Sequence, residues 1–485
     1  MLTLITFLPV LGAIIIVLLP RGQERNLKMI ALGASVLAFV ASLFLLLGFD
    51  AHHTGYQFVN SAEWLPQFGI GYKLGVDGVS IWLLMLTTFT FPIAIWFSFR
   101  SIHDREKEFY ALILLMQTAT LGVFLSLDLF LFYVFWEFAL VPMYFIIGLW
   151  GGERRVYASL KFFIYTMAGS VLMLVGIFYL GSQGGTFDIE KLATQTGLWA
   201  NNSWLFWGFA IAFLIKVPLF PFHSWLPDAH VEAPTPGSVI LAAVLLKMGG
   251  YGLIRFNLGL MPEASQMWSP LLMAVSAIAI IYGAVVAFAQ SDVKKLVAYS
   301  SVSHMGYVVL GIFSLNVIGV SGAILQMVNH GLSTGGLFLI IGFIYERRHT
   351  REMSKFGGLW TKMPLYGTLA LILILSSVGL PALNGFVGEY TILQGAFAQN
   401  RLWTIISTFG MILSAVYLLT MFQKVFLGES RDAANDKLQD LNWREVLTVA
   451  PLIVMCFVIG LAATPFFANM QTSVAQIVGG ALALK

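Results

Sequence analysis

Long apolar runs recur along the whole chain and constrain its fold more than any other feature. Each run is about 20 residues long, the length that an α-helix needs to cross a hydrocarbon core of about 30 Å. Hydrophobic residues make up 58% of the 485 residues and charged residues 11%, whereas soluble domains carry about 25% charged residues. We therefore predict an all-α membrane protein with about 14 transmembrane helices. The runs cover residues 2–20, 28–48, 78–99, 109–127, 128–150, 160–181, 203–222, 236–256, 269–289, 296–314, 317–345, 366–397, 400–427 and 443–465.

The distribution of basic residues predicts the orientation in the membrane. The first run has no basic segment before it and no small-residue cleavage site after it, so it is expected to stay in the membrane rather than act as a signal peptide. Assigning the loops to alternate sides places most of the 27 Lys and Arg residues on one side. Because basic loops face the cytoplasm, both termini are expected on the non-cytoplasmic side.

The sequence carries few groups that could hold a cofactor. Cys456 is the sole cysteine, and one thiol cannot ligate an iron–sulfur cluster or form an internal disulfide. We find no Walker-type phosphate loop, and the glycine-rich GIGYKLG at 69–75 has the wrong spacing for a dinucleotide fingerprint and is expected in a loop. We therefore expect no redox centre and no nucleotide site in this chain.

Proline and glycine interrupt two of the predicted spans. The first interruption is FLIKVPLFPFHSWLPDAH at 213–230, and the second is SSVGLPALNGFVGEY at 376–390. Paired interruptions indicate an internal repeat with a site at its interface, although Pro and Gly are also common in ordinary membrane helices. We predict two five-helix repeats, the second inverted because five is odd. The expected units are N-terminal helices at 1–108, a first repeat at 109–256, a second at 269–427, and a cytoplasmic loop with a final transmembrane helix at 428–485.

Ionisable side chains lie inside several predicted spans. At a rise of 1.5 Å per residue, three of them fall roughly 12–14 Å from the start of their runs, near the middle of the membrane. An unpaired charge at that depth costs on the order of 3 kcal/mol, so the charged members need partners, water or both. The candidate site residues are Glu137, Lys216, Lys247, His304, His330 and Glu389.

Two interpretations of these residues stand side by side. Glu137 and Lys216 could form a buried ion pair that locks two helices together, and His304 and His330 could be ordinary core histidines. Buried ion pairs stabilise weakly, histidine titrates nearest to neutral pH, and broken backbone in a membrane is tolerated where it lines a hydrated cavity. We therefore favour a hydrated proton relay, with Glu137 and Lys216 as a switchable pair beside a broken helix.

The connector HSWLPDAHVEAP, at 223–234, carries further polar residues: His223, Asp228, His230 and Glu232. A metal site is conceivable there, but the spacing of the two histidines matches no usual ligand pattern. We expect a capping and gating connector near the cytoplasmic surface, with no metal.

Several long motifs resemble the antiporter-like membrane subunits of respiratory complex I. They are WEFALVPMYFIIGLWGG (136–152), KFFIYTMAGS (161–170), FHSWLPDAHVEAPTPGSVILAAVLLKMGGYGLIRF (222–256), DVKKLVAYSSVSHMGYV (292–308) and NHGLSTGGLF (329–338). FGGLWTKMP (356–364) and GFVGEY (385–390) are similar to the M-type subunit of bacterial proton-translocating NADH:quinone oxidoreductase. The resemblance covers nearly the whole chain and implies fourteen spans with two inverted five-helix repeats.

The resemblance also implies roles for the site residues. Glu137 matches the carboxylate that is paired with the broken-helix lysine, Lys216, while Lys247 matches the central lysine and His330 the linking histidine. Glu389 matches the terminal station, where related L-type and N-type subunits and sodium/proton antiporters usually carry lysine. The implied activity moves a proton from the cytoplasm through these residues to the periplasm, driven by electron transfer from NADH to quinone.

The resemblance implies that NADH, FMN, iron–sulfur clusters and quinone bind in partner subunits. The expected partners are L-type and N-type sister subunits in a bacterial inner membrane, with no nucleic acid. Two other functions stay open: a subunit of a sodium/proton antiporter or membrane-bound hydrogenase complex, and a purely structural scaffold.

Overall fold

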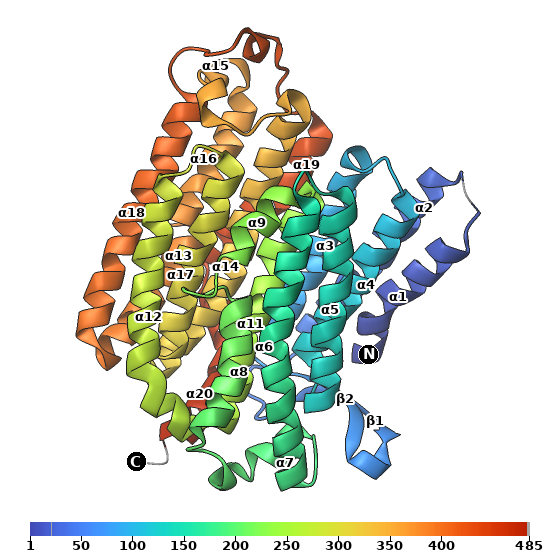
Figure 1. Ribbon diagram of the computed structural model, residues 1–485, viewed down its shortest axis with the longest axis vertical. Helices are drawn as coiled ribbons and strands as arrows, with labels where there is room; N and C mark the ends of the chain where they lie inside the picture. Colours follow the sequence, from blue (N-terminus) through green and yellow to red (C-terminus); the bar gives the residue numbers. More distant parts are fainter. Residues whose placement is uncertain (21, 483–485) are drawn as a thin grey trace.

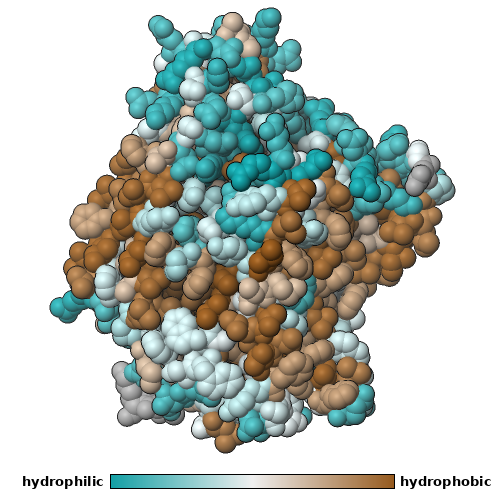
Figure 2. All heavy atoms as spheres, viewed as in Figure 1, coloured by the Kyte–Doolittle hydropathy of each residue, from teal (hydrophilic) through white to brown (hydrophobic). Residues whose placement is uncertain are grey.

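The computed structural model describes residues 1–20 and 22–482, with side chains up to residue 479. Arg21 and Lys485, which enter the charge distribution above, lie outside the described residues. The described chain is almost entirely helical, with one two-stranded hairpin. Long helices run side by side between an upper and a lower end (Figure 1), and apolar side chains dominate the middle of the visible surface (Figure 2). The predicted all-α membrane fold is confirmed.

The first half of the chain begins with two helices, the hairpin and a third helix. Its elements are α1 (Leu2–Leu18), α2 (Glu24–Leu47), β1 (Gln57–Leu65), η1 (Pro66–Phe68), β2 (Ile70–Val76), α3 (Ile81–Ser101), α4 (Glu106–Leu125), α5 (Leu129–Trp150), α6 (Arg155–Gly184), α7 (Ile189–Ala193), η2 (Thr196–Leu198), α8 (Ser203–Lys216), α9 (Trp225–Glu232), α10 (Thr235–Ile240), η3 (Leu241–Leu245), α11 (Leu246–Gly252) and η4 (Leu253–Leu258).

The second half contains the longest helix, α14, which is buried along nearly its whole length. Its elements are α12 (Pro262–Phe288), α13 (Val293–Ile312), α14 (Val317–Arg348), η5 (Met353–Lys355), α15 (Leu359–Lys362), α16 (Pro364–Val378), α17 (Asn384–Gln399), α18 (Arg401–Phe426), η6 (Ala433–Lys437), α19 (Trp443–Leu461) and α20 (Thr464–Leu482).

In the described part of the chain, 10 helices are long and apolar enough to cross a membrane. The helices α1, α8 and α16 are apolar but shorter. The predicted number of about 14 spans therefore stays a prediction.

The first predicted interruption is confirmed. Helix α8 ends at Lys216, and the chain passes through turns that contain Pro218 and Pro221 before α9 begins. Proline cannot donate the backbone hydrogen bond that a continuing helix needs. The indole Nε1 of Trp225 donates to the carbonyl of Ile215 at 2.9 Å, so one carbonyl released at the helix end finds a buried donor.

The second interruption is confirmed as well, between α16 and α17. Gly379 ends α16 with a φ of 84°, in the left-handed region that glycine enters without steric cost. The Ser376 hydroxyl donates to Oδ1 of Asn384 at 2.5 Å, which joins the last turn of α16 to the first turn of α17. Both halves of this broken helix are therefore held at a fixed separation.

Gly385→Val is expected to lower the amount of assembled protein in membranes strongly. A Cβ at Gly385 would lie 2.0 Å from the carbonyl oxygen of Ser376, in the opposing half of the broken helix. Overpacking a tight contact costs about 1–3 kcal/mol or more. Quantitative immunoblotting of membranes measures the effect. Gly33→Val is the matched control, because a Cβ there meets nothing within 4 Å; equal amounts of both variants would contradict the tight contact.

The span between residues 235 and 258 departs from a regular α-helix. Two π-helical segments, η3 and η4, lie on either side of the short α11 that carries Lys247. The whole span is buried inside the protein. Because π-helical turns are rare and occur mostly at functional sites, their position on either side of α11 indicates that Lys247 lies at a functional site.

Two local expectations from the sequence are wrong. Residues 69–75 do not form a loop, because Ile70–Val76 pairs with β1 as an antiparallel strand. The chain continues beyond the last predicted span as α20, whose Asn, Gln, Thr and Ser residues dilute the apolar signal. Helix α20 packs against α14 and α12.

Candidate functional site

Four of the predicted site residues form one connected group in the core. Lys247 Nζ lies 2.7 Å from Nδ1 of His330 and donates to the carbonyl of Ala242. The ring of His330 lies 6.0 Å from the ring of His304, and Nδ1 of His304 lies 2.9 Å from Oε1 of Glu389. None of the four is more than 3% exposed.

Four different elements bring these side chains together. Lys247 comes from α11, His330 from α14, His304 from α13 and Glu389 from α17. Helix α14 packs against α13 and α17 and also contacts α11. A central helix that is buried on all sides can therefore link a lysine on one neighbour to a carboxylate on another.

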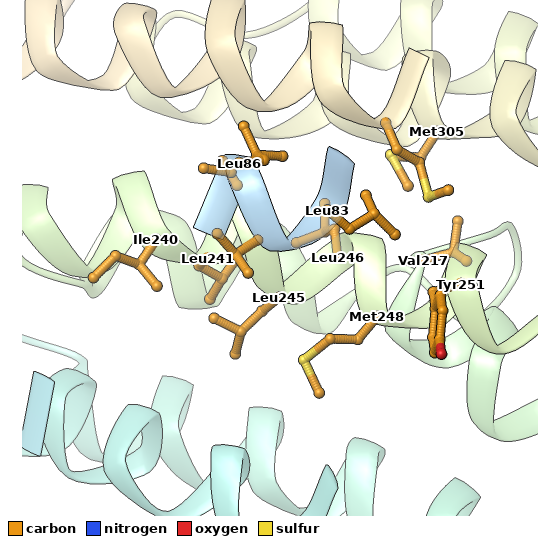
Figure 3. Close-up of a cluster of buried hydrophobic side chains, with 14 of the residues drawn as sticks. Leu83, Leu86, Val217, Ile240, Leu241, Leu245, Leu246, Met248, Tyr251 and Met305 are labelled. Atoms are coloured by element: carbon orange, nitrogen blue, oxygen red, sulfur yellow. The ribbon is translucent and has the colours of Figure 1, made fainter. Parts of the chain in front are cut away.

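The surroundings of Lys247 are apolar. Figure 3 shows the adjacent Leu245, Leu246 and Met248 gathered with Leu83 of α3 and Met305 of α13, and all five are buried. A charged ammonium group is costly in such an environment unless it has polar partners. The contact with His330 and the carbonyl of Ala242 supply these partners.

Two polar residues that were not predicted from the sequence complete the site around Glu389. Nε2 of Gln326 donates to Oε1 of Glu389 at 3.1 Å, and the hydroxyl of Tyr417 lies 3.2 Å from Nε2 of His304. Gln326 precedes His330 by four residues and so lies on the same face of α14, a signal that the sequence offers. Tyr417 lies on α18, and no local pattern connects it to His304.

Glu137 and Lys216 lie near each other without forming a direct ion pair. No contact within 4.0 Å joins their charged atoms in the described structure, although each charge acts on the other. Lys216 is only 1% exposed, and its Nζ lies 5.4 Å from the ring centres of both Trp136 and Phe162. These rings attract the cation through their π-faces. The described structure therefore does not contain the direct Glu137–Lys216 ion pair that the alternative interpretation expects.

Several buried polar atoms of the site have no hydrogen-bond partner within the described protein. They are Oε1 of Glu137, Nε2 of His330, Oε2 of Glu389 and Oδ1 of Asn329. A buried polar group without a partner costs a few kcal/mol, and ordered water is the usual partner where protein supplies none. The site thus keeps hydrogen-bonding atoms that ordered water can satisfy.

The carboxylates of the connector already have partners in the protein. Asp228 Oδ2 lies 2.7 Å from Nζ of Lys161, and Glu232 Oε2 accepts a hydrogen bond from the backbone N–H of Arg154 at 2.9 Å. Among the described residues, no group of three or more His, Cys, Asp or Glu could hold a metal ion. The geometry gives the metal interpretation no support.

Three known proteins are similar to this chain over nearly its whole length. A curated relative named NADH-quinone oxidoreductase subunit M, from Rhodobacter capsulatus, is 44% identical over 99% of this chain and 96% of its own. A chain in the structure of respiratory complex I from Thermus thermophilus with bound NADH superimposes with a TM-score of 0.89, at 33% identity over 99% of this chain and 100% of its own. A chain of the Mrp complex from Dietzia sp. DQ12-45-1b shares the fold, with a TM-score of 0.84 and 24% identity over 100% of this chain and 55% of its own.

A family model described as the transmembrane part of NADH:quinone oxidoreductase/Mrp antiporter proteins matches residues 126–415, which is more than half of the chain. This range contains all six predicted site residues. The chain therefore belongs to the NADH:quinone oxidoreductase/Mrp antiporter transmembrane family.

Proposed function

We propose that this chain is a proton-translocating membrane subunit of NADH:quinone oxidoreductase, the respiratory complex I. The observation that carries the proposal is the buried sequence of contacts from Lys247 through His330 and His304 to Glu389. Each of these groups can bind or release a proton, and adjacent members lie at hydrogen-bonding distance except across the two histidine rings. Water between the rings completes the route.

In the proposed route a proton enters from the cytoplasm at Lys216, whose proton affinity Glu137 adjusts. It then passes to Lys247 and His330, and through His304 to Glu389, from which it leaves to the periplasmic side. Because Glu137 does not hold Lys216 in a direct ion pair, a small movement of either side chain changes their interaction. That change is the step at which energy from the partner subunits enters the route.

The oxidation of NADH takes place in partner subunits of the complex. These subunits supply NADH, FMN, iron–sulfur clusters and quinone, while this chain contributes no redox centre of its own. Its sole cysteine, Cys456, supports this division, since one buried thiol cannot ligate a cluster. The proposed neighbours in the membrane are the L-type and N-type sister subunits.

We further propose that the protein lies in a bacterial inner membrane with both termini in the periplasm. The start of α1, the end of α20 and the hairpin lie toward the lower end in Figure 1, whereas α15 and the loop after α18 lie at the upper end. The basic residues of these upper segments support a cytoplasmic position for that end.

The two inverted repeats, at 109–256 and 269–427, are supported by a pair of matching backbone contacts. Leu129 N–H donates to Phe187 O at 2.8 Å beside the hairpin, and Val293 N–H donates to Arg351 O at 3.0 Å beside the α9–α10 connector. Bridges join Asp128 to Asp188 and Asp292 to Glu352, each across 60 residues. Asp128 caps α5 as Asp292 caps α13. Equivalent contacts at opposite ends of the molecule are what an inverted repeat requires.

Two alternatives predict different partners. A sodium/proton antiporter subunit or a hydrogenase subunit shares the fold, as the likeness to the Mrp complex indicates for the fold alone. Purification in mild detergent followed by mass spectrometry separates them, because only the proposed function predicts quinone oxidoreductase subunits in the sample. A purely structural scaffold predicts that substitutions in the route change assembly and leave proton translocation per turnover unaltered.

Glu137→Ala is expected to lower the number of protons translocated per NADH oxidised in a normally assembled complex. Removing the carboxylate leaves Lys216 without the nearby negative charge that changes its proton affinity. Proton uptake and NADH oxidation are measured together in inside-out membrane vesicles. Glu153→Ala, in the polar loop before α6, is the control and should pump normally. A Glu137→Ala complex with full stoichiometry would contradict the relay.

A further inference from the structure

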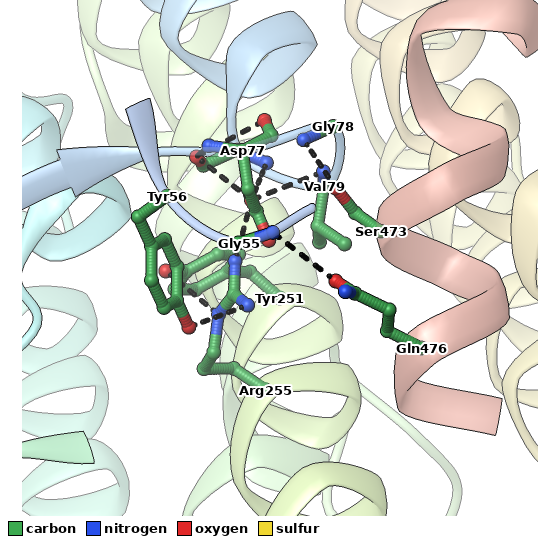
Figure 4. A network of polar contacts seen from close by, with 10 residues as sticks. Gly55, Tyr56, Asp77, Gly78, Val79, Tyr251, Arg255, Ser473 and Gln476 are labelled. Carbon is green, nitrogen blue, oxygen red and sulfur yellow. Dashed lines mark hydrogen bonds and ion pairs between the residues drawn. The ribbon is translucent and has the colours of Figure 1, made fainter. Parts of the chain in front are cut away.

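A second group of charged and polar side chains surrounds Arg255, which lies below Lys247 on the same span. Nη2 of Arg255 lies 2.7 Å from Oδ1 of Asp77, and Nη1 donates to the hydroxyl of Tyr56 at 2.9 Å (Figure 4). Nε of Arg255 donates to the hydroxyl of Tyr251 at 3.3 Å. Arg255 is 5% and Asp77 4% exposed. We call these four residues the Asp77–Arg255 cluster.

The Asp77 carboxylate is held by the start of α3 as well as by Arg255. Its Oδ1 accepts hydrogen bonds from the backbone N–H groups of Val79 and Ser80 and from the Ser80 hydroxyl, each at 3.1 Å. Burial raises the pKa of Tyr56, so its phenol stays protonated and neutral. Tyr56 therefore adds no negative charge beside Arg255.

Helix α20 closes this region from the side. The Gly78 N–H donates to the hydroxyl of Ser473 at 2.9 Å, and the Gly55 N–H donates to Oε1 of Gln476 at 3.4 Å. A Cβ at Gly78 would lie 2.3 Å from the carbonyl oxygen of Asn469, which shows how closely α20 approaches the α3 loop. Little space is left between these segments.

The polar groups of the cluster differ from those of the relay in one respect. His330 and Glu389 each keep a buried polar atom without a partner, whereas no atom of the Asp77–Arg255 cluster is buried and unpartnered. Water enters a buried site where it finds two or more free polar partners. The relay offers such positions and the cluster does not.

The position of Arg255 and its permanent charge also distinguish the Asp77–Arg255 cluster from the relay. Arg255 follows Lys247 by eight residues, roughly 12 Å along the helix toward the hairpin end. An arginine guanidinium does not lose its proton in proteins, and a fixed positive charge in a narrow passage repels protons and other cations. A proton on Lys247 therefore meets a guanidinium whose three nitrogens are all hydrogen-bonded below it, and a histidine with a free ring nitrogen beside it.

We propose that the Asp77–Arg255 cluster is a proton barrier that closes the hairpin end of the Lys247 helix. The barrier makes a proton on Lys247 pass sideways to His330 instead of leaking directly to the periplasm. The inference rests on the proposed function, and it adds a reason for the sideways route.

The test replaces the ion pair by apolar side chains of similar size, in Asp77→Leu/Arg255→Met, within the complete complex. Such replacements of buried ion pairs are often neutral for stability, so we expect NADH oxidation within about twofold of the unaltered complex. A pH gradient imposed on membrane vesicles without NADH is expected to decay at least about threefold faster, because the fixed charge is gone. Decay at the unaltered rate in an assembled complex would overturn the proposal.

Two further variants make the result unambiguous. Lys73→Met/Asp188→Asn alters another ion pair on the hairpin face, 2.8 Å long and partly exposed, and should leave the decay unchanged. Arg255→Gln removes the fixed positive charge and keeps a side chain that can donate a hydrogen bond to Asp77, so it replaces the double variant if that complex does not assemble. A smaller acceleration of the decay supports the proposal, and no acceleration overturns it.

Adding Lys247→Ala to the leaking variant tests the route of the leak. If the leaking protons pass along Lys247, the decay should return to the unaltered rate. A leak that persists shows a path that avoids Lys247 and overturns the assigned place of the barrier. Since the gradient is imposed and no NADH is oxidised, the result does not depend on whether this chain pumps.

Discussion

Lys247→Met is expected to abolish proton translocation by the assembled complex and to slow coupled NADH oxidation at least about tenfold. Lys247 Nζ contacts Nδ1 of His330, and methionine fills a similar volume without binding a proton. Its sequence neighbours Leu246 and Met248 are apolar and cannot carry a proton. Rates and proton uptake are measured on the same vesicles, with the amount of assembled complex determined by native electrophoresis.

Lys247→Arg separates a proton carrier from a fixed charge. Arginine keeps the positive charge but does not release its proton, so the relay predicts that this variant also fails to translocate. A scaffold that needs only a cation predicts normal activity for Lys247→Arg and poor assembly for Lys247→Met. Full translocation in either variant would refute the role of Lys247 as a carrier.

Glu389→Gln is expected to lower proton translocation by about tenfold or more while the complex assembles normally. Glutamine has the same shape and can still bond to Gln326 and His304, but its amide neither takes up nor releases a proton. The last station of the route is thereby blocked without a change in packing. The measurement is the ratio of protons moved to NADH oxidised.

Glu389→Asp serves as the matched control. Aspartate restores a titratable carboxyl group but shortens the side chain by one methylene, which lengthens the contact of 2.9 Å to His304. We expect translocation to recover in part. If glutamine and aspartate variants translocate equally well, the carboxyl group of Glu389 does not carry the proton.

The membrane explains why much of the fold was predictable from the sequence. Backbone polar groups must be satisfied internally in lipid, so apolar runs of the right length become helices. Pro218, Pro221 and Pro381 mark both interruptions because proline cannot continue helical hydrogen bonding. The predicted breaks therefore agree with the ends of α8 and α16.

Elements that do not depend on a continuous apolar run escaped prediction. The strand Ile70–Val76 exists because Gln57–Leu65 lies beside it, and neither segment has the alternation of a half-buried strand. Helix α20 is interspersed with amides and hydroxyls that bond to the loops around Ala51 and Gly78. In both cases the stabilising partner lies far away in the sequence.

The ionisable site residues were visible because charges are rare in membrane spans. Their pairing was not, since His304 and Glu389 are separated by 85 residues. The same holds for Arg255, which lies at the end of the predicted span 236–256 and is separated from its partner Asp77 by 178 residues. The sequence alone identifies ionisable side chains whose burial in the membrane is costly. The tertiary structure shows which of them lie close enough to pass a proton and which form fixed ion pairs.

The two π-helical segments lie on either side of the turn that carries Lys247. Each widens the helix so that one more residue fits in a turn than an α-helix allows. Removing one residue from such a segment would leave an ordinary α-helical turn, and Lys247 would still face α14. Removing one residue from the α-helical stretch Leu246–Gly252 would instead turn everything after it by roughly 100°. Length changes among related chains should therefore fall in the surface loops or in the two π-helical segments, and not in α11.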